Sequence, residues 1–171
     1  GSWAARLAAA RGALIVGLSD VGGTIYDAKG LNLKAIDQAY RDGAKSVVDT
    51  GVGDVVARGI AGSTAVFGLD CDVLMPCALG DAVGETEANS IKAKLVVEGA
   101  NGPLTPTADL ILAEKGIVVI PDVYANAGGV TCSYLEQCQN FAHLTWDEDE
   151  VNARVIDLMR AAFERFYAFT Q

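Results

Sequence analysis

The sequence predicts an α/β fold in which helices cover a doubly wound parallel sheet. Three observations lead to this prediction: short β-branched runs that are apolar at nearly every position, helical segments between them, and glycines at the junctions. Such runs are typical of parallel strands, because helices cover both faces of a parallel sheet. The runs are residues 13–18, 71–75, 93–97 and 116–120.

Helix signals fall between these runs. The first helix is expected over residues 2–10, with Gly12 in the position that ends it. A second is expected over residues 105–115, since it opens with a threonine cap and a first-turn proline. Residues 44–67 are rich in glycine and less regular, with residues 47–48 interpreted as a short strand.

The C-terminal segment predicts an amphipathic helix. Residues 145–148 form a capping box, in which Thr145 caps the helix and Glu148 reaches back. Apolar residues then recur every three or four positions along one face: Val151, Val155, Leu158, Ala162, Phe166 and Phe169. We therefore divide the chain into a sheet domain, residues 1–144, and a C-terminal helix, residues 145–171, that packs on this domain or on a neighbouring one.

Composition argues against several classes of protein. The 171 residues are 51% apolar and 20% charged, which is too apolar for a disordered chain. The net charge of −9 opposes binding to nucleic acid or to an acidic membrane. No apolar run reaches the ~18 residues of a membrane span, and the N-terminus has no signal-peptide pattern. We expect a cytoplasmic protein.

Metal binding and nucleophilic catalysis receive little support. The chain has four cysteines, none in a C-x-x-C spacing, and one histidine, His143, so we expect no metal site. Cys77 and Cys132 are candidates for reactive thiols, but free cysteines packed in a reducing compartment are the preferred interpretation.

Polar and small residues follow the predicted strands. Ligands of an open parallel sheet bind beyond the carboxyl ends of its strands. Asp20 follows the first run, Asn101 the third and Asn126 the fourth, while Cys77 and Ala78 follow the second. An acid in the place of Asp20 accepts both hydroxyl hydrogens of an adenosine ribose, although a turn-forming aspartate explains it equally well. A plain Asn-Gly turn also explains Asn101.

A helix that begins near Ala127 would carry further candidates. Asn126, Val130 and Ser133 would share one face near its N-terminus. The two glycines after Ala127 would leave backbone N–H groups uncovered, and these favour an anion such as a small carboxylate substrate. The alternative is that the glycines allow close packing and that Ser133 bonds only its own helix.

Four blocks carry a family resemblance: residues 16–26, 69–79, 91–103 and 118–140. In these blocks the chain resembles the nucleotide-binding domain of the glutamate/leucine/phenylalanine/valine dehydrogenase family, and within it the glutamate-specific branch most. The resemblance implies a Rossmann-like fold and NAD(P)-dependent oxidative deamination of L-glutamate to 2-oxoglutarate and ammonia. It also implies assembly into a homo-oligomer, a hexamer in the family.

The resemblance further implies individual roles. The residues that would contact the cofactor are Gly1, Ser2, Asp20, Cys77, Ala78, Asn101 and Asn126. Asp20 would meet the adenosine ribose, and Asn101 and Asn126 would lie near the nicotinamide and its ribose. Val130 and Ser133 would flank the substrate, with Ser133 bonding the distal carboxylate. Asp20 is acidic and no basic residue follows it directly. Both features favour NAD, with NADP as the alternative.

Two departures from the family pattern concern parts that precede Gly1. The strand and the leading glycines of the G-x-G-x-x-G fingerprint have no counterpart here. The family's other domain, which holds the catalytic lysine and aspartate, has none either. We therefore expect a cofactor-binding part, truncated at its N-terminal side, whose parallel sheet lacks its first strand and which carries no catalytic residue. The alternatives are a noncatalytic nucleotide-binding or regulatory module, or a leucine, phenylalanine or valine dehydrogenase.

Overall fold

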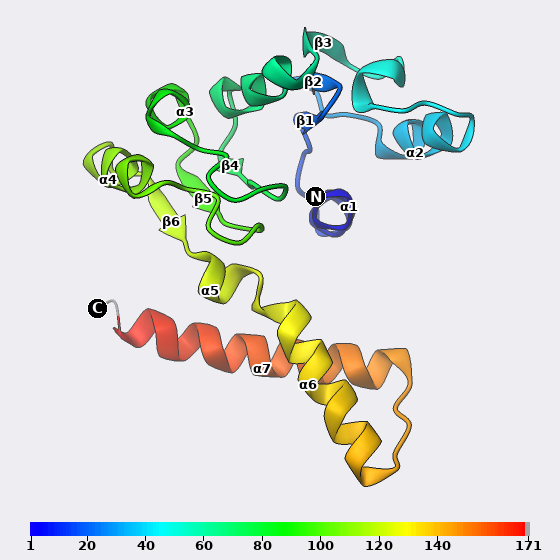
Figure 1. Cartoon of the computed structure of the whole chain (residues 1–171). Coiled ribbons are helices and arrows are strands. Elements are labelled where there is room, and N and C mark those ends of the chain that lie inside the picture. The colour runs from blue at the N-terminus through cyan, green and yellow to red at the C-terminus, as the bar shows by residue number, and fades with distance from the viewer. Residues whose placement is uncertain (170–171) are drawn as a thin grey trace.

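A three-stranded parallel sheet forms one half of the main body in the computed structural model, which describes residues 1–169 (Figure 1). Helices α3 (Glu85–Ser90) and α4 (Pro106–Glu114) lie between its strands in the chain. Its strands, in spatial order, are β4 (Val73–Leu74), β5 (Leu95–Val97) and β6 (Val118–Ile120). This alternation of parallel strands with helices confirms the α/β class.

A second sheet of three antiparallel strands forms the other half, in the order β1 (Gly17–Asp20), β2 (Gly23–Tyr26) and β3 (Asp54–Arg58). The prediction that the first apolar run belongs to the parallel sheet is therefore wrong. The strand begins at Gly17 rather than at residue 13, and it pairs with β2 in a hairpin. A two-residue turn closes this hairpin, so pairing β1 with β2, its neighbour in the chain, costs little loop-closure entropy.

Residues 44–67 contain helical turns as well as β3. The expected strand at residues 47–48 is wrong, since the 3₁₀ helix η1 (Val47–Asp49) occupies this place. Ser46 ends the preceding segment, and its Oγ accepts the N–H of Val48 at 3.3 Å, which caps the turn. A second 3₁₀ helix, η2 (Ile60–Gly68), follows β3.

The main hydrophobic core lies on one face of the parallel sheet. Leu74 and Val96 pack there with Leu112 of α4, which is completely buried. On the other side Val73 and Val118 remain 47% and 57% exposed. The expectation that helices cover both faces of these strands is thus met on one face only within the described residues.

The helices α1 (Ser2–Ala10) and α2 (Leu33–Arg41) lie beside the antiparallel sheet. The Arg6 guanidinium on α1 contacts the Asp37 carboxylate on α2 at 2.6 Å and joins the two helices. The predicted helix over residues 2–10 is confirmed, and Gly12 follows it with a φ of +94°. The cap of α4 is also confirmed, since Thr105 Oγ1 accepts the N–H of Ala108 at 3.2 Å.

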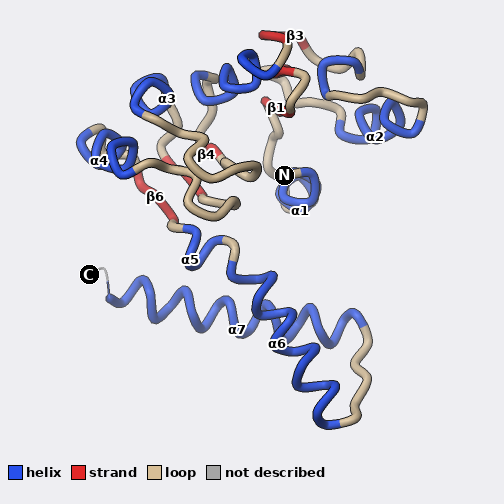
Figure 2. The backbone as a smooth tube through the Cα atoms, in the orientation of Figure 1, coloured by secondary structure: helices blue, strands red, loops and turns tan. Residues whose placement is uncertain are grey.

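Three helices at the C-terminal end form an arm beside the body: α5 (Asp122–Ala125), α6 (Ala127–Ala142) and α7 (Glu148–Phe169). The backbone trace shows that α6 leads away from the sheet and that α7 runs back across α6 toward the side of α5 (Figure 2). The Tyr124 ring of α5 lies 5.5 Å from Phe163 and 6.1 Å from Phe166, between ring centroids. Its hydroxyl donates to the Met159 carbonyl at 3.2 Å. These contacts tie α7 to α5.

The cap and the buried face of α7 differ in detail from the prediction. Asp147 Oδ1 accepts the N–H of Glu150 at 2.8 Å, so Asp147 caps the helix in place of Thr145. Four residues of the predicted stripe are half-buried as expected: Val151, Val155, Ala162 and Phe166. Leu158 and Phe169 are instead 44% and 92% exposed, whereas Met159 is half-buried. Within residues 1–169, no helix is long and apolar enough to cross a membrane.

The core predicts the effect of a pair of substitutions in α4. Leu112→Ala should lower the free energy of unfolding by about 2–5 kcal/mol, because it leaves a cavity at a fully buried site. Leu110→Ala, at a position 66% exposed on the same helix, should change it by less than about 0.5 kcal/mol. Urea titration followed by circular dichroism measures both, and equal losses would contradict this assignment of the core.

Candidate functional site

The carboxyl ends of β4, β5 and β6 lie at one edge of the parallel sheet, and the chain segments that leave them meet there. Asn101 lies in the segment after β5, and Asn126 lies between α5 and α6. The Asn126 amide Nδ2 donates to Asn101 Oδ1 at 2.6 Å. The structure therefore brings these two sequence-predicted residues into direct contact, although 25 positions separate them in the chain.

A hollow of about 600 Å³ lies at this edge. Its lining includes four of the residues predicted to contact the cofactor, together with Val130 from α6 and several small neighbours: Cys77, Ala78, Leu79, Gly80, Gly99, Ala100, Asn101, Asn126 and Val130. A Cβ added at Gly99 would come within 2.6 Å of Cys77 Sγ, and one at Gly80 within 3.2 Å of the Asn101 carbonyl oxygen. Glycine at these positions lets the segments after β4 and β5 approach each other closely.

Two carboxylates fix the segment that carries Asn101. Glu98 Oε2 accepts the N–H of Asp122 at 2.8 Å, and Asp122 Oδ2 accepts the N–H of Gly102 at 2.7 Å. Burial raises the pKa of Glu98, and the nearby carboxylates raise it further against the effect of its backbone hydrogen bonds. Together these bonds hold the exit of β5 against the start of α5.

Gly1 and Ser2 lie at the same edge. Gly1 directly precedes α1, and a Cβ added to it would lie 3.6 Å from the Cβ of Cys77. Both Gly1 and Ser2 are exposed. The N-terminus of α1 is thus next to the hollow, and its unpaired N–H groups are donors for a negatively charged group.

Asp20 is not among the residues that line this hollow. Its side chain accepts hydrogen bonds from the Gly22 and Val47 N–H groups and from the Ser46 and Tyr40 hydroxyls, at 2.6 to 2.9 Å. Partial burial by itself raises the pKa of Asp20, but the four hydrogen bonds outweigh it and hold the pKa below its usual value. Asp20 is therefore an ionised group at the junction of β1, α2 and η1.

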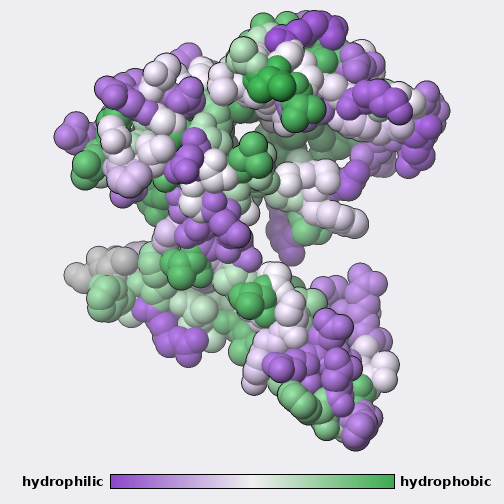
Figure 3. Space-filling view, viewed as in Figure 1, coloured by the Kyte–Doolittle hydropathy of each residue, from purple (hydrophilic) through white to green (hydrophobic). Residues whose placement is uncertain are grey.

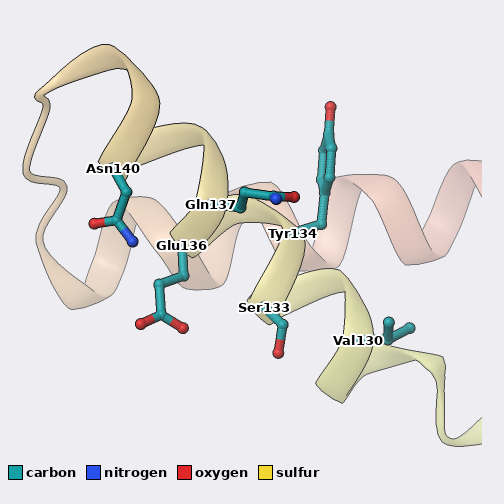
Figure 4. A pocket seen from close by; sticks show the side chains of 6 residues that line it. All are labelled: Val130, Ser133, Tyr134, Glu136, Gln137 and Asn140. Carbon is teal, nitrogen blue, oxygen red and sulfur yellow. The ribbon is translucent and has the colours of Figure 1, made fainter.

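A second, open groove of about 450 Å³ runs along α6 (Figure 4). It is lined by Val130, Ser133, Tyr134, Glu136, Gln137 and Asn140. Figure 4 shows that Ser133 and Glu136 project to the same side of the helix, while Tyr134 projects the other way. No lysine or arginine is among these described lining residues. Val130, which is 69% exposed, lines both the groove and the hollow and connects them.

One of the N–H groups that we expected to be uncovered at the start of α6 is engaged within the chain. The helix α5 leads directly into α6, and the Gly129 N–H is engaged by the Asn126 carbonyl at 3.4 Å. Ser133 Oγ donates to the Gly129 carbonyl of its own helix at 3.3 Å. A Cβ at either glycine would meet no atom within 4 Å, so these glycines serve no close packing in the described residues.

Some residues of the site were not predicted from the sequence. Gln137 and Asn140 follow Ser133 at helical spacing, so the same periodicity that selected Ser133 would have found them. Tyr40 and Ser46, which bind Asp20, lie 20 and 26 positions from it and carry no local signal.

Comparison with known proteins agrees with this arrangement. The sequence profile of the Glutamate/Leucine/Phenylalanine/Valine dehydrogenase family matches residues 1–171. The chain is 40% identical to the NAD-specific glutamate dehydrogenase of Staphylococcus aureus (strain COL) over 171 residues. This match covers 100% of the chain and 40% of the relative, so the chain spans about two fifths of the length of that curated relative.

Solved structures agree as well. A hetero-hexameric glutamate dehydrogenase from Thermus thermophilus, in its Leu-bound form, matches 96% of this chain and 38% of its own, with a TM-score of 0.81 and 30% identity. The glutamate dehydrogenase of Peptoniphilus asaccharolyticus matches 98% of this chain and 37% of its own, with a TM-score of 0.76 and 27% identity.

The fold is thus the Rossmann-like α/β type that amino-acid dehydrogenases use. The chain belongs to the glutamate/leucine/phenylalanine/valine dehydrogenase family, and its structural neighbours are glutamate dehydrogenases.

The environment of Asp20 predicts a pH-dependent contribution to stability. Asp20→Asn should lower the free energy of unfolding at pH 7 by about 1–3 kcal/mol, because four donors lose their charged acceptor. The pKa of Asp20 is lowered from 3.8, so its contribution is complete above that value and is lost as the pH falls through the folded-state pKa. Urea titrations should show a smaller difference in the free energy of unfolding between wild type and Asp20→Asn at pH 3 than at pH 7.

The control for this experiment is Asp54→Asn, which removes an exposed carboxylate from β3. It should change the free energy of unfolding by less than about 0.5 kcal/mol at both pH values. An Asp20→Asn loss that stayed the same at pH 3 would contradict the ionised state assigned to Asp20.

Proposed function

We propose that this chain is the cofactor-binding part of an NAD-dependent glutamate dehydrogenase, which converts L-glutamate to 2-oxoglutarate and ammonia. The observation that carries the proposal is the pair Asn101–Asn126 at the edge of the hollow, where parallel strands end. Each amide can donate and accept a hydrogen bond, which suits the carboxamide and the ribose hydroxyls of a nicotinamide nucleotide. The family and the named relatives support the same assignment.

The residues present fit such a cofactor. The small side chains around the hollow allow a flat ring to approach the backbone, and a Cβ at Gly99 would fill the space against Cys77. When bound, a nicotinamide ring supplies the acceptor for the hydride that leaves the substrate. Ala78, Asn101 and Asn126 would hold the cofactor, and Val130, which lines the same hollow, would lie on the side from which the substrate approaches.

The preference for NAD over NADP follows from charge. Asp20 is ionised, and the hairpin turn after it, Val21–Gly22, contributes no cation. A 2′-phosphate placed there would meet a like charge that no cation of this turn compensates. The Staphylococcus aureus relative, which is named NAD-specific, agrees with this preference.

The substrate groove needs a second part of the protein. Ser133 offers a hydroxyl to the distal carboxylate of glutamate, but Glu136 projects to the same side and no cation lines the described groove. A lysine from another domain or subunit would neutralise the substrate carboxylates there. The space-filling view shows that the arm leaves open space next to the body (Figure 3). We place the substrate in this space, with the catalytic groups outside residues 1–169.

The remaining parts of the proposal concern the assembly and the compartment. The Thermus thermophilus relative is described as hetero-hexameric, which supports assembly into an oligomer, and we propose that the protein that contains this chain is a homo-oligomer. We propose the cytoplasm as its location, and a small-molecule substrate as its partner.

A binding experiment tests the cofactor site. The 171-residue chain should bind NADH, and Asn101→Ala or Asn126→Ala should weaken binding about two- to tenfold through the loss of one hydrogen-bonding amide. NADH fluorescence titration measures the dissociation constants. Asn89→Ala, an exposed position on α3 away from the hollow, is the matched control and should leave NADH affinity unchanged. Equal effects of Asn89 and Asn101 substitutions would contradict the site.

A kinetic experiment tests the substrate assignment. In a protein that joins this chain to a substrate-binding domain of the family, Ser133→Ala should reduce kcat/KM for glutamate about tenfold or more. Use of norvaline, which lacks the distal carboxylate, should change far less. An equal loss on both substrates would remove Ser133 from the carboxylate role. The chain by itself should show no turnover, and amino-acid-dependent NADH production by it would overturn that expectation.

A further inference from the structure

The Asp20 carboxylate has no acceptor position left. Oδ1 accepts the Gly22 N–H at 2.9 Å and the Ser46 hydroxyl at 2.6 Å. Oδ2 accepts the Val47 N–H at 2.8 Å and the Tyr40 hydroxyl at 2.9 Å. An ionised carboxylate offers about four lone-pair positions. Each oxygen of Asp20 thus holds one backbone N–H and one side-chain hydroxyl, and a further donor must displace one of them.

The backbone donors cannot easily leave. The Gly22 N–H belongs to the β1–β2 turn, and the Val47 N–H belongs to the first turn of η1, so displacing either would unfold a local element. A ribose presents two neighbouring hydroxyl groups. Because the backbone donors stay in place, a ribose hydroxyl that binds Asp20 would replace one of the two protein hydroxyl groups that now donate to the carboxylate.

The two hydroxyl donors differ in how firmly they are held. Ser46 is only 6% exposed, its Oγ also accepts the Val48 N–H at 3.3 Å, and a Cβ added at Gly22 would collide with it. Tyr40 lies in the last turn of α2 and is 39% exposed. Its side chain can rotate into solvent without breaking a backbone hydrogen bond. A ribose hydroxyl would therefore displace the Tyr40 hydroxyl rather than the Ser46 hydroxyl.

We propose that the Tyr40 hydroxyl occupies the position on Asp20 Oδ2 that a cofactor ribose hydroxyl takes, so that Tyr40 competes with the ribose and is displaced when it binds. This inference rests on the proposed function, because it takes Asp20 as the ribose acceptor. Tyr40 in this role keeps Asp20 Oδ2 hydrogen-bonded while the ribose is absent, and it lowers the affinity for the cofactor.

The ionisation of Tyr40 supports its role as a donor. Partial burial and the hydrogen bond to Asp20 raise its pKa to about 12, with Asp20 and Asp49 adding repulsion against the phenolate. The hydroxyl consequently keeps its proton across the pH range in which a dehydrogenase works, and the competition persists throughout that range.

The test compares NADH affinities of four proteins by fluorescence titration: the 171-residue chain, Tyr40→Phe, Tyr26→Phe and Asp20→Asn. Tyr40→Phe should bind NADH about three- to tenfold more tightly, since the ribose no longer displaces a hydrogen bond to a charged group. Tyr26→Phe is the matched control, because the Tyr26 hydroxyl donates to the Asp70 carbonyl instead, at 3.5 Å. It should leave NADH affinity unchanged, and Asp20→Asn should weaken it.

An analogue of NADH whose adenosine ribose lacks both hydroxyls separates competition from a general change in structure. Its affinity should be the same for the wild-type chain and for Tyr40→Phe. In a 3-fluorotyrosine-labelled chain, the ¹⁹F resonance of Tyr40 should shift on saturation with NADH while that of Tyr26 stays in place.

The outcomes distinguish this inference from the function on which it rests. Unchanged or weaker NADH binding by Tyr40→Phe, with Asp20→Asn still weakened, overturns the competition and leaves the cofactor site intact. A ¹⁹F resonance of Tyr40 that does not shift on saturation with NADH also overturns the competition and leaves the cofactor site intact. Absence of NADH binding by all four proteins overturns the proposed function and this inference together.

Discussion

Parallel pairing of β4, β5 and β6 is the constraint on which the candidate site depends. Parallel strands carry their carboxyl ends to one edge of a sheet, so the segments that leave them must meet there. Asn101 and Asn126 come into hydrogen-bonding contact for this reason. The glycines in these segments then decide how closely they approach, since a Cβ at Gly99 would overlap Cys77. The hollow is a consequence of strand direction together with small side chains.

Carboxylates that accept hydrogen bonds from backbone N–H groups hold the segments around the site in place. Glu98 and Asp122 connect the exits of β5 and β6, and Asp20 connects its own hairpin with α2 and η1. In each case a carboxylate accepts from backbone N–H groups in a turn, in a loop or at the first residue of a helix, which have no partner within a helix or a strand pair. Hydrogen bonds to a charged acceptor are stronger than those between neutral groups. The same saturation that makes Asp20 a structural junction also means that any ligand at Asp20 has to replace a donor of the protein.

Several elements could be predicted because their signals are local. The threonine and proline before α4 fix its start, and the glycine after α1 marks its end, whatever the rest of the chain does. The apolar runs that became β4, β5 and β6 were recognised because β-branched side chains suit a pleated, buried surface. Asn101 and Asn126 were selected as residues that follow such runs, so their proximity was predictable once parallel pairing was assumed.

Other features were decided by the tertiary structure. Val47 and Val48 have strand-forming side chains, yet they form a 3₁₀ turn because Ser46 caps it and both valines are buried. Two residues with capping side chains lie close together before α7, and the structure places Asp147 rather than Thr145 as its cap. The sequence by itself determined the fold class, the family and the polar residues at the strand ends, since these follow from local patterns. Only the tertiary structure decided that β1 pairs in a separate sheet and that Tyr40 and Ser46 fill the acceptor positions of Asp20. The contacts of Tyr40 and Ser46 with Asp20 join positions 20 and 26 residues apart, which leave no local signal. The partner of β1 is local, but β3, which completes that separate sheet, lies far away in the chain.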